Sequence, residues 1–87
     1  MAKYTVCTVL DMVAGQYGRP FFAVSEGSAL RGFADEVNQN TESMLYKHPS
    51  DFQLFMLGEF DDANAQFELI SPPKLIVSGA AVVNRPE

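Results

Sequence analysis

The chain has 87 residues, of which 47% are hydrophobic and 20% charged, and its formal net charge is −5. These values are typical of one small globular domain and exclude a disordered chain; no apolar run approaches the ~18 residues of a membrane span. The six basic residues are dispersed along the sequence, which excludes strong nonspecific DNA binding by a monomer, since such binding depends on clustered Lys and Arg.

The N-terminal third predicts two strands. Residues 3–12 are rich in β-branched and aromatic residues, as strands are. Residues 14–20 contain two glycines and a proline, which is typical of a connection. Residues 20–24 then predict a short second strand, with Pro20 at its first position or on a sheet edge.

One convincing helix follows over residues 25–40. Either Ser25 or Ser28 can cap it, because a serine hydroxyl accepts a hydrogen bond from a free amide of the first turn. Apolar residues recur at helical spacing and form one stripe: Leu30, Phe33, Ala34 and Val37. Gly32 lies inside the helix at a cost of about 1 kcal/mol relative to alanine, which we attribute to a close approach of helix and sheet.

The second half of the chain predicts two or three more strands. Residues 51–60 form the longest, a turn rich in Asp and Asn follows, and residues 67–70 return as a fourth strand that the prolines of 71–73 stop. Residues 74–83 are either a fifth strand broken near Gly79 or an arm that packs on a neighbour.

This order of elements predicts an α+β fold: a small antiparallel sheet of four to five strands with one helix packed on a face. We expect a single domain over residues 1–87, with a core over about 3–71 and a C-terminal strand or arm over 72–87.

The predicted strand over 51–60 is apolar on both of its faces. A strand of this kind is either central or covered by another subunit. A chain of this size also has a thin core that association would supplement. We therefore expect a homo-oligomer whose interface uses the apolar residues of this strand and of the C-terminal segment: Phe55, Leu57, Leu75 and Val77.

The sequence contains few candidates for catalysis or metal binding. The acidic residues near the second turn (Glu59, Asp61, Asp62 and Glu68) lack the glycine and alternating ligands of a calcium loop, so we interpret them as turn residues. The single histidine, His48, adjoins Ser50 and Asp51 too closely in sequence to form a triad. Cys7 lies among valines in a strand-like run, which predicts a small buried apolar side chain. We predict that the protein is not an enzyme and has no metal or cofactor.

The ten Phe and Tyr residues leave nucleic-acid binding open. Aromatic faces bind single strands by stacking at about 1–3 kcal/mol per base, with help from a modest positive groove. The candidates are Tyr17 and Tyr46 for stacking, with Tyr4, Phe22 and Phe55 as further half-exposed rings, and Arg19, Arg31 and Lys47 for charge. The alternative is that the phenylalanines build the core and the tyrosines border it.

Two segments carry a resemblance to a known family. "RPFFAVSEGSALRGFADEVN" and "HPSDFQLFMLGEFDDANAQFEL" resemble the small nonstructural protein of gokushovirus-type microviruses, which are single-stranded DNA phages. The similarity spans roughly residues 4–70. Ala65 departs from it, because the family has a glycine in that turn.

The resemblance implies a phage protein of the host cytoplasm with a role in viral single-stranded DNA synthesis or packaging, often described as DNA-binding. Two hypotheses follow. In the first, the protein binds single-stranded DNA as an oligomer. In the second, it is an acidic oligomeric interaction module that regulates a phage or host replication or assembly protein without touching DNA. Neither involves a membrane.

Overall fold

The computed structural model describes residues 2–85 and confirms the predicted α+β class. Its elements in chain order are β1 (Lys3–Asp11), β2 (Gln16–Tyr17), β3 (Phe21–Ala23), α1 (Glu26–Gln39), α2 (Met44–Lys47), the 3₁₀ helix η1 (Pro49–Asp51), β4 (Phe52–Asp61), β5 (Gln66–Ser78) and α3 (Gly79–Val82). The predicted long strands and the long helix are all present, whereas β2, α2, η1 and α3 were not expected.

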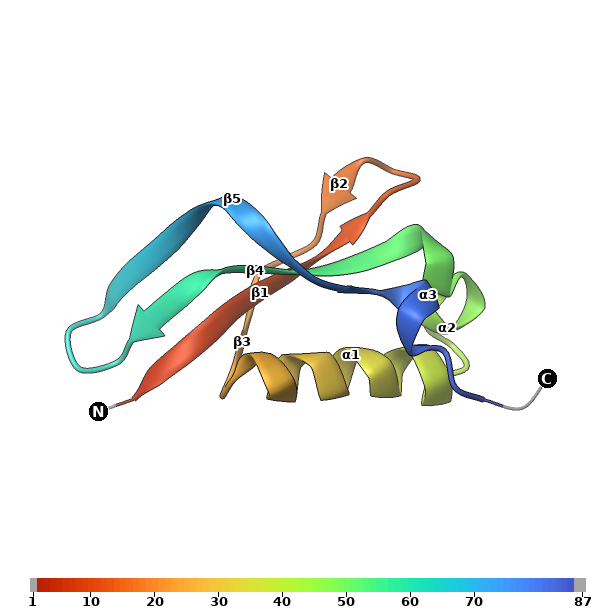
Figure 1. Ribbon diagram of the computed structural model, residues 1–87, viewed down its shortest axis with the longest axis horizontal. Coiled ribbons are helices and arrows are strands. Elements are labelled where there is room, and N and C mark those ends of the chain that lie inside the picture. Colours follow the sequence, from red (N-terminus) through yellow and green to blue (C-terminus); the bar gives the residue numbers. More distant parts are fainter. Residues whose placement is uncertain (1, 86–87) are drawn as a thin grey trace.

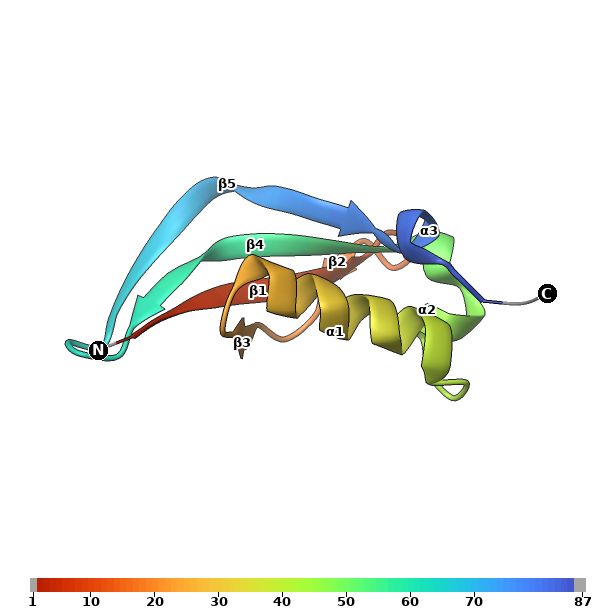
Figure 2. The same cartoon turned by 60° about the horizontal axis from the view of Figure 1, so that its bottom comes forward.

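The strands form one antiparallel sheet in the order β2-β1-β4-β5, with β3 also paired to β1. Figures 1 and 2 show α1 along one face of a strongly curled sheet, with the hairpin of β4 and β5 reaching past the start of the helix. We call the face under α1 the covered face. The opposite face, which no helix of residues 2–85 covers, is the open face.

Helix α1 is capped by Ser25, one of the two serines that the sequence predicts as caps. The hydroxyl of Ser25 accepts a hydrogen bond from the Ser28 amide at 3.1 Å, which satisfies one of the free donors of the first turn. Ala29, Phe33 and Val37 are the buried residues of its inner face. They pack against Cys7 and Leu54 of the two central strands, and this contact forms the core.

Cys7 is fully buried, as the alternation of the first strand indicated. Burial raises the pKa of its thiol, and the Glu26 carboxylate raises the pKa further because it disfavours a second negative charge nearby. A thiol that stays protonated and inaccessible is a poor nucleophile, so Cys7 acts as a small apolar side chain of the core.

The prediction that residues 71–73 stop a strand is wrong. Strand β5 runs continuously through them, but there it is not paired with β4. Gly58 of β4 pairs with Leu69, and Met56 pairs with Lys74. The four β5 residues in between, 70–73, therefore lie opposite Leu57 alone and form an unpaired arch. Because the two prolines lie in this unpaired arch, their missing amide hydrogens cost no ladder hydrogen bonds.

Up to Arg85, the C-terminal segment packs within the fold of its own chain. Its first part is the second half of β5, and the chain turns into α3 at Gly79, close to the predicted break. The Asn38 side chain of α1 donates to the Val82 carbonyl and accepts from the Asn84 amide. The Arg85 guanidinium donates to the Tyr46 carbonyl and lies 3.8 Å from the centre of the Tyr46 ring.

The two hairpin turns are built alike. In "DMVAGQ" and "DDANAQ" the first aspartate accepts hydrogen bonds from turn amides, and the fifth residue donates its amide back to the aspartate carbonyl. That fifth residue has a positive φ in both turns, 70° at Gly15 and 59° at Ala65. Ala65 therefore occupies a position that favours glycine, the residue that the resemblance led us to expect in this turn.

We expect Ala65→Gly to raise the free energy of unfolding by about 1 kcal/mol, because an alanine held in the left-handed region is strained by about that amount. The matched change in the other turn, Gly15→Ala, should lower it by a similar amount. Urea denaturation followed by circular dichroism measures both. A loss of stability in Ala65→Gly would contradict the equivalence of the two turns.

Candidate nucleic-acid interface

The open face is made of four cross-strand rows. Every second residue of a strand points to the same face, so the paired positions of β1, β4 and β5 define each row. From the hairpin end inward, the rows are Tyr4, Phe60 and Phe67; then Val6, Phe22, Gly58 and Leu69; then Thr8, Phe55 and Leu75; and then Leu10, Tyr17, Gln53 and Ser78.

Aromatic rings dominate this face. Phe22, Phe60 and Phe67 form one cluster, with ring centres 4.9 to 6.4 Å apart. Tyr17 stands edge-on to Phe55 at 5.6 Å and forms a second group. Tyr17, Phe22 and Phe67 are each slightly more than half exposed, at 53%, 55% and 52%. Each therefore has ring surface that contacts the solvent.

The charged residues of the strands lie on the covered face. The alternate rows hold all of them within β1, β4 and β5: Lys3, Asp11, Glu59, Asp61, Glu68 and Lys74. Three of them form ion pairs: Lys3 with Glu68 at 3.5 Å, and Lys74 with Glu26 of α1 at 3.1 Å. The chain thus separates an uncharged aromatic sheet surface from a charged one.

The structure distributes the predicted nucleic-acid residues over separate elements. Tyr17 lies on the open face, and Arg19 follows in the exposed connection to β3. Arg31 is exposed on α1 and Lys47 is exposed on α2, so both lie on the helical side of the molecule. Tyr46 is half-buried, with the Arg85 guanidinium against its ring.

The predicted interface residues also divide between the two faces. Phe55 and Leu75 are paired on the open face, where Leu75 is 49% exposed. Leu57 is half-buried opposite the arch of β5. Val77 pairs with Leu54 and packs against the core under α1.

The sequence pattern missed Phe60 and Phe67 as members of the aromatic surface. The available signal was the register of the second hairpin: a turn over residues 62–65 places these two rings opposite each other on one face. Phe22 joins them only because β3 folds back onto the start of β1, which is a long-range pairing that spacing does not reveal.

The two aspartates of the hairpin tip accept hydrogen bonds from backbone amides. Asp61 accepts from the Ala63 amide at 2.9 Å, and Asp62 accepts from the Ala2 amide at 2.8 Å. Within residues 2–85, no group of three or more His, Cys, Asp or Glu side chains is arranged to hold a metal ion. The exposed His48 lies between α2 and η1, away from these carboxylates in the fold.

None of the helices in residues 2–85 has the length and apolar character that crossing a bilayer requires. No curated protein and no solved structure gives a significant match to the chain. A family model described as "Phage ORF5 protein" matches residues 4–82. This range contains every helix and strand of the structure, apart from Lys3 at the start of β1. The chain therefore belongs to the Phage ORF5 protein family, and it is a phage protein.

Proposed function

We propose that this phage protein acts in viral single-stranded DNA synthesis or packaging, as in the microviruses it resembles, by binding single strands on the open face. It is a nonstructural protein of the host cytoplasm that works by binding rather than by catalysis, without a cofactor. The observation that supports this function is the uncharged sheet face with three half-exposed rings, Tyr17, Phe22 and Phe67.

Single-stranded bases stack on exposed aromatic rings with little regard to sequence, because every base has a flat apolar face. An acidic chain repels phosphates, so the position of its carboxylates decides whether such binding is feasible. The strand carboxylates Asp11, Glu59 and Glu68 lie on the covered face, and the exposed Arg19 adjoins the open face beside Tyr17. The local charge at the rings is thus more favourable than the net charge of −5.

Binding by an oligomer would overcome the remaining shortage of positive charge. A single chain brings few free cations to the strand, since Lys3 and Lys74 form ion pairs and Arg85 contacts Tyr46. A homo-oligomer would multiply Arg19 along one strand of DNA and bring Arg31 and Lys47 of neighbouring copies within reach of the phosphates. Linked sites on one strand strengthen one another without any new contact.

Fluorescence anisotropy of labelled single-stranded and double-stranded oligonucleotides tests this function. We expect preference for single strands, and affinity that falls with salt. Tyr17→Ala and Phe22→Ala should each weaken binding about tenfold, which corresponds to the ~1.4 kcal/mol of one lost stack. Met44→Ala is the matched control, because Met44 is 55% exposed on α2, away from the open face.

Circular dichroism must show that the variants keep the fold, which we expect because all three side chains are exposed. Absence of binding to any oligonucleotide at low salt would overturn the proposal. So would equal losses in Met44→Ala and in the two aromatic variants, since the effect would then not belong to the open face.

A second function is favoured by the aliphatic part of the same face. Leu69 and Leu75 are 68% and 49% exposed, and exposed apolar surface of this kind marks protein interfaces. On this reading the protein is an interaction module that self-associates and regulates a replication or assembly protein.

Leu75→Asp separates the two functions. We expect this variant to become monomeric in sedimentation analysis if copies associate through the open face, because it places a charge in an apolar contact. Leu75 is exposed in the single chain, so the fold should persist. An unchanged mass, together with retained DNA binding, would exclude an interface at this position and leave the aromatic rings as the functional part.

A further inference from the structure

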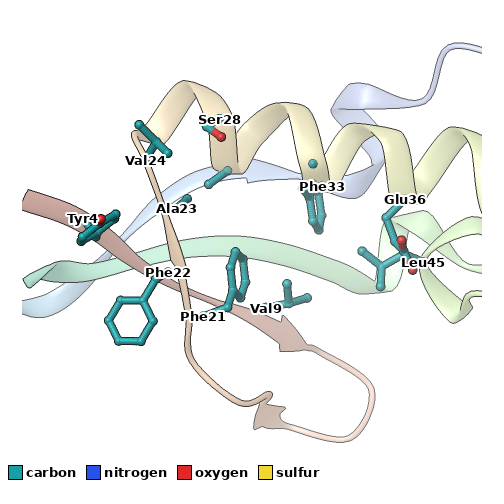
Figure 3. A pocket seen from close by; sticks show the side chains of 12 residues that line it. Tyr4, Val9, Phe21, Phe22, Ala23, Val24, Ser28, Phe33, Glu36 and Leu45 are labelled. Atoms are coloured by element: carbon teal, nitrogen blue, oxygen red, sulfur yellow. The ribbon is translucent and has the colours of Figure 1, made fainter.

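An apolar groove of about 550 Å³ lies between β3 and α1, and Tyr4 and Phe22 of the open face also border it. Figure 3 shows Phe33 descending from α1 and Phe21 rising from β3 toward the same space, with Leu45 of α2 at one end. Val24 borders the groove and is 75% exposed. The groove is therefore an open apolar surface separate from the charged hairpin tip.

Gly32 lines this groove in the middle of α1. Within the described part of the chain, a Cβ added at Gly32 would meet nothing within 4 Å outside the helix backbone, so our expectation of a close approach between helix and sheet at this position is wrong. A glycine inside a helix costs about 1 kcal/mol relative to alanine. No crowding within residues 2–85 requires this glycine, and its effect is to leave this side of the groove free for another side chain.

Glu36 is the single charged residue among those that line the groove, and Figure 3 shows its side chain directed down beside Leu45. Its Oε2 accepts a hydrogen bond from the Asn40 amide group at 2.9 Å. Among residues 2–85, Oε1 has no hydrogen-bond partner or ion pair. A half-buried carboxylate oxygen at the end of an apolar groove favours a cationic group of a ligand.

We propose that the β3–α1 groove binds a basic, apolar peptide segment of a partner protein. An apolar side chain of the segment would occupy the space over Gly32, between Phe21 and Phe33, and a Lys or Arg would reach Oε1 of Glu36. The net charge of −5 attracts such a basic partner. This site goes beyond DNA binding on the open face. Tyr17 lies on the open face but not in the groove, and Glu36 lines the groove but not the open face, so variants at these two positions let either proposal fail without the other.

Selection from a displayed library of random twelve-residue peptides tests the groove, with Gly32→Leu protein as the counter-target. We expect enriched peptides that combine apolar residues with Lys or Arg. Gly32→Leu should weaken their binding at least about tenfold, because its side chain fills the groove, while the helix becomes more stable. Thermal unfolding confirms that this variant is folded.

Glu36→Gln is a second variant that tests the groove even if Gly32→Leu does not fold. We expect about fivefold weaker binding of the selected basic peptides to Glu36→Gln, and no change in Asp35→Asn, which alters an exposed acid of the same helix. Three results would overturn the proposal: no enrichment, enrichment of peptides without basic residues, or equal binding to wild type and Gly32→Leu. A wild-type dimer that Gly32→Leu converts to a monomer would also overturn it, because a second copy would then occupy the groove.

Discussion

Gly58→Ala is expected to lower the free energy of unfolding by at least about 3 kcal/mol, which is a large share of the stability of a domain this small. A Cβ at Gly58 would lie 2.1 Å from the Glu68 carbonyl oxygen and 2.8 Å from the Leu69 Cα, both of them backbone atoms of β5. The φ of Gly58 is 153°, which side-chain-bearing residues rarely adopt. Urea denaturation followed by circular dichroism measures the loss.

The physical reason is the curl of the sheet. At Gly58 the register of β4 shifts against both neighbours, and β5 crosses close over the strand before it enters its arch. An added methyl group would push β5 away and break the pairing on both sides of the arch. The effect should therefore extend over the whole sheet and lower the amplitude of the native β-sheet signal.

Gly32→Ala is the matched control, because it adds the same methyl group where space is open. We expect it to raise the stability by about 1 kcal/mol through helix propensity alone. If Gly58→Ala retained stability within about 1 kcal/mol of wild type, the close crossing of β4 and β5 would be contradicted.

Gly79→Ala is expected to detach α3 from the domain. A Cβ at Gly79 would lie 2.0 Å from the Pro49 carbonyl oxygen and 2.9 Å from its carbonyl carbon, so α3 and η1 cannot keep their contact. Because η1 is joined directly to β4, the displacement should fall on α3 and the residues after it. We expect a loss of about 3 kcal/mol, with the hydrogen bonds of Asn38 to Val82 and Asn84 broken.

Amide hydrogen exchange distinguishes this local effect from the global one at Gly58. In Gly79→Ala the amide of Asn84 should lose its protection, while the central amides of β1 and β4 remain slower to exchange. Ala80→Gly is the control, since Ala80 is exposed and the change should cost only about 1 kcal/mol. Full protection of the Asn84 amide in Gly79→Ala would contradict the tight packing of α3 on η1.

The sequence predicted the regular elements because their signals are local. The Ser25 cap is set by one hydroxyl, and the structure has it. Helical spacing correctly placed Phe33 and Val37 in the core, but the third buried residue of α1 is Ala29, and the predicted Leu30 and Ala34 are only half-buried. The alternation of β1 likewise identified Cys7 as buried. Such signals do not depend on what the rest of the chain does.

The errors came from contacts between distant residues. Two prolines end a strand only where their amides would be needed for pairing with a neighbouring strand. In β5 they lie in the arch that is not paired with β4, so the strand continues through them. The sequence does not predict where the C-terminal segment packs, because its partners Asn38 and Tyr46 are about 40 residues away in sequence. The role of Gly32 was misjudged for the same reason, since only the fold shows whether a side chain there would meet a neighbour.

The candidate site shows the same division. Exposed aromatic residues could be proposed from composition, and Tyr17 was named from the sequence. The gathering of Phe22, Phe60 and Phe67 required knowledge of two strand pairings. The separation of charges between the two faces is likewise a property of the register, which composition and net charge conceal.

The most direct test of the open face is a titration of isotope-labelled protein with an oligothymidine, followed by amide chemical shifts in NMR spectra. The proposed function predicts that the largest changes cluster at the aromatic rows of β1, β3, β4 and β5 and around Tyr17, while α1 changes little. Unchanged spectra at low salt, or changes confined to α1 and the groove beside it, would contradict single-strand binding on this face.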